Sequence, residues 1–295
     1  AYFPTALMHD TFSLGDITAV IGDNSAHEKH RAGYNGIWSL THKCEPANLF
    51  VPEVTGFNLE HIFDGATLDI GDDGTIFFEP RKAPMEFKKL GDHEAELHQP
   101  PTPTFHLESW TKFKLVAPHY IDISFRCQAT QHVFENGYIG LFWASYINAP
   151  EDKSMYLRGK QGWLQHCSPA HNNQSTVLHE DDRYELRFAP GHRDCLYKNF
   201  TPLKYDLPLF YGLFKNQTYI AMFDRTSGIR FTQSPSGGGF NKELQTTLPA
   251  WDFQFITPHY EILTDYSFRC RIAYRPRCSR EDVLKEYEGW KKELG

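Results

Sequence analysis

The chain has 295 residues, 40% hydrophobic and 23% charged, which is the composition of a folded globular protein. Its 30 Lys and Arg against 37 Asp and Glu give a formal net charge of −7, so neither a nucleic acid nor an anionic membrane is the expected partner. The longest apolar runs, such as residues 139–144, are far shorter than the ~20 residues of a membrane helix. The sequence is compatible with a cytoplasmic protein and with an exported one whose leader has been removed. It does not indicate an oligomeric state.

The first third of the chain predicts strands joined by polar loops. Residues 1–65 are rich in Gly, Asn, Asp and His, with short apolar stretches such as residues 17–21. Residues 66–70 and 75–79 are typical of two strands, and the Gly-Asp-Asp-Gly turn at 71–74 joins them as a hairpin. Residues 91–104 are polar and end in Pro-Pro-Thr-Pro, which indicates a surface linker. The chain is therefore one domain, 1–295, with a possible division into two lobes near 91–104.

The rest of the chain reads as strand after strand, separated by turn signals at intervals of roughly ten residues. The predicted strands are residues 110–116, 120–127, 138–146, 184–188, 209–214, 218–223, 229–232, 253–256 and 266–274. A helix is expected only at 279–294, where Ser279 and Asp282 form a capping box and an apolar stripe would dock on the β body. These patterns predict an all-β protein, a large antiparallel β-sandwich with one C-terminal helix.

The six cysteines are widely spaced and contain no Cys-x-x-Cys pair. We expect buried free thiols, with one or two disulfides as the alternative if the chain is exported. The cysteines are Cys44, Cys127, Cys167, Cys195, Cys270 and Cys278.

Residues 23–36 hold the first candidate site. Five consecutive side chains, 27–31, bind protons or anions, and nearby glycines allow tight turns. Glu28 and His30 are the candidates for proton transfer, and Arg31, Tyr34 and Asn35 for ligand binding. A solvated charged loop and a metal shared by two histidines are the alternatives.

Residues 58–65 hold the second candidate site, because Glu60, His61 and Asp64 lie among apolar residues. An acid in apolar surroundings has a raised pKa, as a general acid needs near neutral pH. In a regular strand Glu60 and His61 face opposite sides, so only one of them should share a pocket with Asp64. The alternative is a set of structural hydrogen-bonded groups.

Three further segments carry polar or aromatic groups. The histidine-rich segment 166–182 is predicted to be a long loop, mobile or functional. Trp143 and Trp251 are predicted platforms for the apolar face of a sugar, with Asp252 and Gln254 for its hydroxyl groups; the alternative is that both indoles belong to the core. The glycine-rich residues 234–239 lack the Lys-Ser/Thr of a phosphate-binding loop and are predicted to be a flexible loop.

Six phrases of the sequence resemble a family of largely uncharacterised bacterial proteins, and the likeness covers nearly the whole chain. They are Asp23-Asn-Ser-Ala-His, His30-Arg-Ala-Gly-Tyr-Asn-Gly, Leu59-Glu-His-Ile-Phe-Asp-Gly, Phe142-Trp-Ala-Ser-Tyr-Ile-Asn-Ala-Pro-Glu-Asp-Lys, Gln233-Ser-Pro-Ser-Gly-Gly-Gly and Pro249-Ala-Trp-Asp-Phe-Gln. This family implies no activity. The strand-rich body also resembles, in architecture only, the β-sandwiches of aldose mutarotases and many polysaccharide-degrading enzymes, which implies a mutarotase-like or jelly-roll sandwich.

Together these features predict a carbohydrate-active enzyme of the glycoside hydrolase, lyase or epimerase type. Glu60 and Glu28 would be its carboxylates and His61 and His30 their proton-handling partners, while Arg31 and Asp64 would position hydroxyl groups or a uronate carboxylate. We expect residues 27–35 and 60–64 to converge on one concave site with no resident cofactor. The alternatives are a non-catalytic glycan-binding module and a metal-dependent β-sandwich enzyme that uses a divalent metal.

Overall fold

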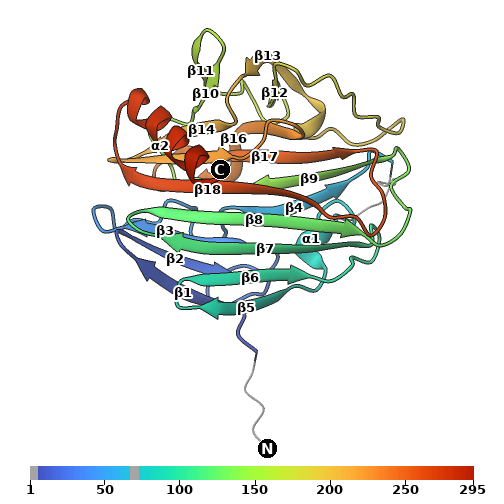
Figure 1. Cartoon of the computed structure of the whole chain (residues 1–295), viewed down its shortest axis with the longest axis horizontal. Coiled ribbons are helices and arrows are strands. Elements are labelled where there is room, and N and C mark those ends of the chain that lie inside the picture. The colour runs from blue at the N-terminus through green and yellow to red at the C-terminus, as the bar shows by residue number, and fades with distance from the viewer. Residues whose placement is uncertain (1–5, 67–72) are drawn as a thin grey trace, which may run out of the picture.

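The computed structural model describes residues 6–66 and 73–295, which form two large sheets and one small sheet (Figure 1). The small sheet is β1 (His9–Leu14), β2 (Ile17–Gly22) and β3 (Gly36–His42). The nine-stranded sheet has the order β11 (Gly162–His166), β10 (Met155–Gly159), β14 (Leu209–Phe214), β15 (Gln217–Phe223), β18 (Tyr266–Pro276), β8 (Tyr120–Ala129), β7 (Leu107–Val116), β6 (Glu94–Gln99) and β5 (Glu86–Gly91). The six-stranded sheet has the order β13 (Phe200–Tyr205), β12 (Thr176–His179), β16 (Ile229–Asn241), β17 (Thr246–Pro258), β9 (Tyr138–Ala144) and β4 (Asn58–Phe63).

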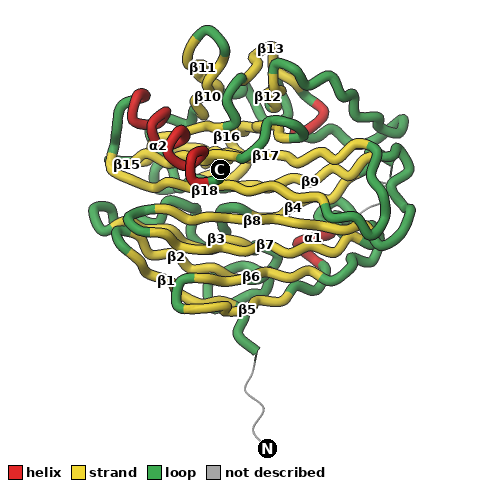
Figure 2. Tube along the Cα trace, in the orientation of Figure 1, coloured by secondary structure: helices red, strands yellow, loops and turns green. Residues whose placement is uncertain are grey.

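The predicted fold class is confirmed. The ladders are antiparallel except for the parallel pair β12–β13, and strands dominate the chain (Figure 2). The core lies between the large sheets, where Trp143 of β9 stacks on Phe253 of β17 at 4.8 Å and Phe125 of β8 meets Trp143 edge-on at 4.8 Å. Aromatic pairs of this geometry add to the stability gained from burying their area.

The six-stranded sheet is covered on both of its faces. Along β9, alternate residues such as Leu141 and Trp143 belong to the inner core, while Tyr138 and Phe142 belong to a separate cluster on the outer face. Such a strand reads as a continuous apolar run, as residues 138–146 do. The outer face therefore needs cover from segments outside the two sheets.

One cover is an extended segment, residues 182–189, which we call the strap. Tyr184, Leu186 and Phe188 pack on the outer cluster, while the residues between them are exposed. The predicted strand at 184–188 is wrong because these residues join no ladder, although the alternation that suggested it is present. An alternating pattern reports one buried face, whether or not the backbone pairs with a sheet.

The strap is fastened to the sheet and to the turn that follows β4 by hydrogen bonds of its backbone. The Tyr138 hydroxyl donates to the Arg187 carbonyl at 3.0 Å, Arg230 Nη2 donates to the Tyr184 carbonyl at 2.7 Å, and the Ala189 amide donates to the Gly65 carbonyl at 2.7 Å. A Cβ on Gly65 would lie 1.8 Å from the Arg187 carbonyl oxygen, and its φ of +77° also favours glycine. The strap therefore crosses the outer face at a fixed position.

The C-terminal helix α2 (Arg280–Glu293) begins with the expected capping box of Ser279 and Asp282. It lies against the nine-stranded sheet, where Val283, Tyr287 and Trp290 pack on residues of β14, β15 and β18 (Figure 1). Among the described residues, 6–66 and 73–295, no helix is both long and apolar enough to cross a bilayer.

Two shorter helical turns are α1 (Glu79–Lys82) and η1 (Leu196–Lys198). In the hairpin predicted for residues 66–79, residues 67–72 lie outside the described residues. The second predicted strand, residues 75–79, is wrong. Residues 75–78 form a turn that leads into α1, because Pro80 in the first helical turn favours a helix start over a ladder.

Three predicted loops also contain strands. The polar segment 91–104 includes β6, whose Ala95, Leu97 and Gln99 are buried by alternation. The segment 166–182 includes β12, and residues 234–239 lie within β16, where the register shifts against β17. All six cysteines are free thiols, of which Cys127, Cys195 and Cys270 are buried, while Cys44 and Cys167 are exposed and Cys278 is partly exposed.

Candidate active site

A cavity of about 340 Å³ opens on the outer face of the six-stranded sheet. Its floor comes from β4, β9 and β17, and its walls come from separate loops and α1. The lining combines aromatic and ionisable side chains, as sites for small polar ligands do. The residues that line it are Tyr34, Glu60, His61, Phe77, Phe78, Arg81, Phe142, Ala144, Tyr146, His171, Asn172, Arg193, Asp194, Cys195, Leu196, Tyr197, Gly237, Ala250 and Asp252.

A β-bulge in β4 brings Glu60 and His61 into this cavity together. Leu59 pairs with Trp143 and His61 pairs with Phe142, so Glu60 is an extra residue in the ladder. A bulge interrupts the alternation of a strand and redirects a side chain. The prediction that the two residues face opposite sides is therefore wrong, because it assumed a regular strand.

Glu60 is 7% exposed and is surrounded by groups that favour its ionised form. Tyr146 donates its hydroxyl to Oε1, Arg81 Nη1 lies 3.6 Å from the same oxygen, and His61 Nε2 lies 3.2 Å from Oε2. Burial by itself would raise the pKa of Glu60, but His61, Arg81 and Tyr146 bring that pKa below its usual value. The predicted raised pKa is wrong, and Glu60 is better suited to accept a proton than to supply one.

The second nitrogen of His61 fixes the protonation of its ring. Nδ1 lies 2.6 Å from the carbonyl oxygen of Phe77, and a carbonyl only accepts, so Nδ1 carries a proton. Nε2, the other ring nitrogen, faces Glu60 Oε2 at 3.2 Å. This contact holds the imidazole against the carboxylate in the orientation that proton transfer requires.

Besides Glu60, the cavity is lined by the carboxyl groups of Asp194 and of Asp252 in β17, and Asp252 is 1% exposed. Its Oδ1 accepts the amide of Ser145 at 2.9 Å. Burial, reinforced by the negative charge of Glu60, raises the pKa of Asp252 well above its usual value. The cavity thus holds two carboxyl groups whose pKa values are displaced in opposite directions.

The walls add aromatic rings and cations. Arg81 of α1 stacks over the Tyr34 ring at 4.1 Å and donates from Nε to the Gly33 carbonyl at 3.3 Å. On another wall His171 Nδ1 lies 2.7 Å from the Ser234 hydroxyl, and burial lowers the pKa of this histidine. Ring faces and fixed hydrogen-bonding groups thus border the same space.

Four of the predicted site residues line this cavity: Tyr34, Glu60, His61 and Asp252. The loop 23–36 and strand β4 therefore meet at one concave site, but through Tyr34 instead of the ionisable cluster 27–31. The predicted residues outside the lining are Glu28, His30, Arg31, Asn35, Asp64, Trp143, Trp251 and Gln254.

The ionisable cluster 27–31 has local partners instead. The Glu28 side chain is 83% exposed and lies 3.9 Å from His27. His30 stacks on Trp38 at 3.6 Å and donates from Nε2 to the Tyr34 carbonyl at 2.7 Å, while burial lowers its pKa to about 4. Arg31 lies 5.3 Å from the Tyr34 ring. These contacts shape the loop that presents Tyr34.

Both predicted tryptophan platforms are wrong, because Trp143 and Trp251 are 1% exposed and lie in the core. Asn35 is also buried, with its amide group bonded to Asn58 and the Leu59 carbonyl. The Asp64 carboxylate accepts the backbone amides of residues 66 and 135. Gln254 is fully buried and bonds to two threonines.

Several lining residues carry no clear signal in the sequence. Arg81 fell next to a segment predicted as a strand, so nothing indicated its approach to Glu60. Tyr146 was visible only as one of several aromatic residues after Trp143. His171 and Asn172 lie in the histidine-rich segment 166–182, and only the fold places that segment at the cavity. Within 6–66 and 73–295, no three His, Cys, Asp or Glu side chains are grouped so that they could hold a metal ion.

Comparison with known proteins adds the fold class. No family model matches the chain, and no curated protein matches it. A solved structure of a candidate aldose 1-epimerase from Escherichia coli K12 is similar over 91% of this chain and 99% of its own, with 8% identity and a TM-score of 0.53. A galactose mutarotase-like protein from Lactobacillus casei is similar over 90% and 100%, with 8% identity and a TM-score of 0.50.

The chain therefore has the β-sandwich fold of galactose mutarotase-like proteins, as the architectural resemblance implied. The similarity is one of fold, and the chemistry of this chain rests on its own cavity.

Proposed function

We propose that this protein is an aldose epimerase-type enzyme that opens and recloses the ring of a single sugar by acid–base catalysis. The observation that carries the proposal is the pair Glu60 and Asp252, two carboxyl groups in one cavity with pKa values displaced in opposite directions. Such a split is what assigns one group as base and the other as acid. The fold of candidate and mutarotase-like sugar epimerases supports the same class.

Glu60 is the base in this mechanism. Its ionised carboxylate removes the proton of the anomeric hydroxyl group, and the electrons of that O–H bond form the C1 carbonyl as the bond from C1 to the ring oxygen breaks. The ring oxygen takes its proton from Asp252. The product is the open-chain aldehyde, with Glu60 protonated and Asp252 ionised, so atoms and charge balance.

Reclosure returns both groups to their starting states. After rotation about the bond between C1 and C2, Asp252 removes the proton from the former ring oxygen, which attacks the other face of the carbonyl. The carbonyl oxygen takes the proton from Glu60. His61 holds the Glu60 carboxylate in place throughout, and Arg81 and Tyr146 stabilise its charge.

The geometry suits a sugar placed between the two carboxyl groups. Glu60 on β4 and Asp252 on β17 flank β9, so their backbones are two strand spacings apart, about 10 Å. The rings of Tyr34, Phe77 and Tyr197 offer apolar faces for the C–H side of a pyranose. Walls on several sides favour one sugar unit over the interior of a long chain.

The test is anomer interconversion measured by polarimetry and by exchange NMR on a panel of aldohexoses, 6-deoxyaldoses and aldopentoses. The expected result is acceleration for at least one sugar in wild type and loss of it in Glu60→Gln. Glu28→Gln is the matched control, since Glu28 is exposed outside the cavity, and it should behave as wild type.

Two results would contradict the proposal. Sugar binding without acceleration for any member of the panel would assign a glycan-binding module. Release of shorter products from oligosaccharides, with no anomer interconversion, would assign a hydrolase or a lyase instead.

A further inference from the structure

A second cavity, of about 270 Å³, lies on the same sheet near the strap, separate from the first. It is lined by His179 and Asp181, by the start of the strap, by the turn 226–228, and by Arg230, Ile256 and Pro258. Asp252, Gln254 and Ile256 alternate along β17 and share its outer face. Asp252 borders the first cavity and Ile256 the second, about 13 Å apart along the strand.

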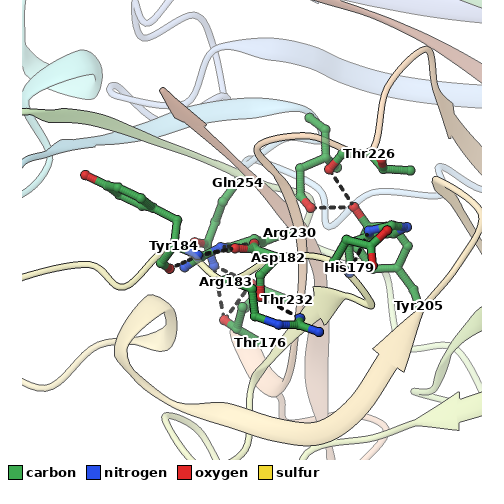
Figure 3. A network of polar contacts seen from close by, with 12 residues as sticks. Thr176, His179, Asp182, Arg183, Tyr184, Tyr205, Thr226, Arg230, Thr232 and Gln254 are labelled. Atoms are coloured by element: carbon green, nitrogen blue, oxygen red, sulfur yellow. Dashed lines mark hydrogen bonds and ion pairs between the residues drawn. The ribbon is translucent and has the colours of Figure 1, made fainter. Parts of the chain in front are cut away.

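Arg230 is the central charged group of this cavity and is 1% exposed (Figure 3). Nε and Nη2 donate to the two oxygens of Asp182 at 2.8 and 3.0 Å, and Nη2 also donates to the Tyr184 carbonyl at 2.7 Å. The ion pair thereby anchors the strap to β16. It uses only one side of the guanidinium.

The other side leaves a buried donor without an acceptor. Nη1 of Arg230 has no hydrogen-bond partner among the described residues, and neither has Oε1 of Gln254. The two residues are direct cross-strand partners in β16 and β17, and Figure 3 shows them next to each other. Gln254 Nε2 is occupied by the hydroxyls of Thr176 and Thr232, so its orientation is fixed with Oε1 unpaired.

Leaving both groups unpaired is costly in a protein interior. Arg230 lines the adjoining cavity and Gln254 does not, so the group within reach of a ligand is the guanidinium, whose Nη1 can donate to a hydroxyl oxygen. The adjoining cavity is far larger than one water molecule needs, so it has room for a ligand that carries such a hydroxyl.

The charges of the lining favour a neutral ligand. Asp182 already neutralises Arg230, and the remaining charged side chains, Asp181 and Arg183, are one of each sign. An anion would find no uncompensated positive charge there. Tyr184, Ile256 and Pro258 add apolar surface of the kind that borders the C–H face of a sugar ring.

We propose that this second cavity is a binding site for a neutral polyhydroxylated ligand, of the sugar or cyclic polyol class, with one hydroxyl directed at Arg230. The site is separate from the catalytic cavity and requires no turnover. Its ligand is therefore not the sugar positioned between Glu60 and Asp252.

The probes are methyl β-D-glucopyranoside and myo-inositol, both neutral, with inorganic sulfate and D-glucuronate as anionic comparisons. Isothermal titration calorimetry and saturation-transfer NMR are run on wild type and on Ser227→Trp, which places an indole at the exposed rim. We expect the variant to bind at least one neutral probe at least tenfold more weakly, with one fewer site per chain. Its rate of anomer interconversion should stay within twofold of wild type.

A second variant tests the hydroxyl contact. Replacing the buried ion pair as a whole, Asp182→Leu with Arg230→Met, avoids leaving a lone buried charge. It should also lose the neutral probe, and Glu60→Gln should retain it. The proposal is overturned if Ser227→Trp binds the neutral probes as wild type does, or if the site takes sulfate or glucuronate in preference to them. If the protein proved to have no epimerase activity, the expected binding of the neutral probes at the second cavity would stay the same.

Discussion

Two glutamates of this protein each contact a tyrosine, an arginine and a histidine, but their surroundings differ. Glu60 accepts from Tyr146 and lies near Arg81 and His61. Glu286 of α2 accepts from Tyr120 at 2.6 Å and Arg275 at 2.7 Å, with His119 at 3.5 Å. Their side chains are 10% and 12% exposed.

The difference lies in the neighbouring carboxyl group. Glu60 shares its cavity with Asp252, whose burial raises the pKa, whereas Asp282, near Glu286, has its pKa lowered by the Ser279 hydroxyl. A Tyr, an Arg and a His around a glutamate therefore hold a carboxylate ionised in either place. Only beside an acid that keeps its proton does this arrangement provide the two groups that ring opening requires.

The largest expected effect tests Glu60 as the base. Glu60→Gln keeps the shape of the side chain and removes its ability to take a proton, so turnover should fall by about 10²–10⁴. Circular dichroism and thermal unfolding should show a folded protein. Turnover near that of wild type in folded Glu60→Gln would assign this residue to the scaffold, as with Glu286.

Asp252 is expected to give the next effect, since it supplies the proton to the ring oxygen. Asp252→Asn still accepts the Ser145 amide but carries no transferable proton, so turnover should fall by about 10² with a nearly unchanged melting temperature. In wild type, activity should fall at low pH as Glu60 becomes protonated and at high pH as Asp252 ionises. Loss of the high-pH decline in a variant that keeps Asp252 would contradict this assignment.

Glu286 should affect stability and leave the chemistry unchanged. Burial would raise the pKa of Glu286, but His119, Tyr120 and Arg275 lower it to about 2 from a usual 4.5. This shift corresponds to a contribution of about 3 kcal/mol to the free energy of unfolding. Because the folded-state pKa is depressed, this stabilisation is complete above pH 4.5 and is lost as pH falls towards 2. Urea unfolding between pH 6 and pH 3 should show a steeper loss in wild type than in Glu286→Gln, at equal turnover per folded molecule at neutral pH.

Among the substitutions in the catalytic cavity, Tyr146→Phe should have the smallest effect on turnover. It removes one of the donors that lower the pKa of Glu60, so the low-pH limb of the activity profile should move to higher pH. At neutral pH, turnover should fall less than tenfold because His61 and Arg81 remain. A Tyr120→Phe variant, matched at the Glu286 cluster, should leave the pH profile of activity unchanged.

The fold was predictable because burial of one face of a strand or helix makes apolar residues recur at regular spacing in the sequence. Alternation marked β7 and β8, and the capping box marked the start of α2. The strap was predicted as a strand because its apolar residues alternate, although its backbone pairs with no sheet. The strand β6 was predicted as a loop because its less buried face carries polar side chains. Pro80 turned an expected strand partner into a helix start.

The site was predictable only in part, for a different physical reason. Glu60 and His61 stood out as ionisable groups in an apolar setting, and Asp252 as an acid beside an indole. Neither the bulge nor the approach of Arg81 from another segment leaves a local signal. The sequence also does not show which face of the sheet a tryptophan occupies, so it leaves both a sugar platform and a core position open for Trp143 and Trp251, and the structure places both in the core.

The bulge at Glu60 has a consequence for how such a site can arise and disappear in evolution. One additional residue in β4 places two consecutive ionisable side chains on one face while Leu59 and Ile62 still point into the core. Loss of a single codon there would restore a regular ladder with its apolar residues intact. Homologues with this sheet and without the extra residue would then fold as this chain does and lack its base.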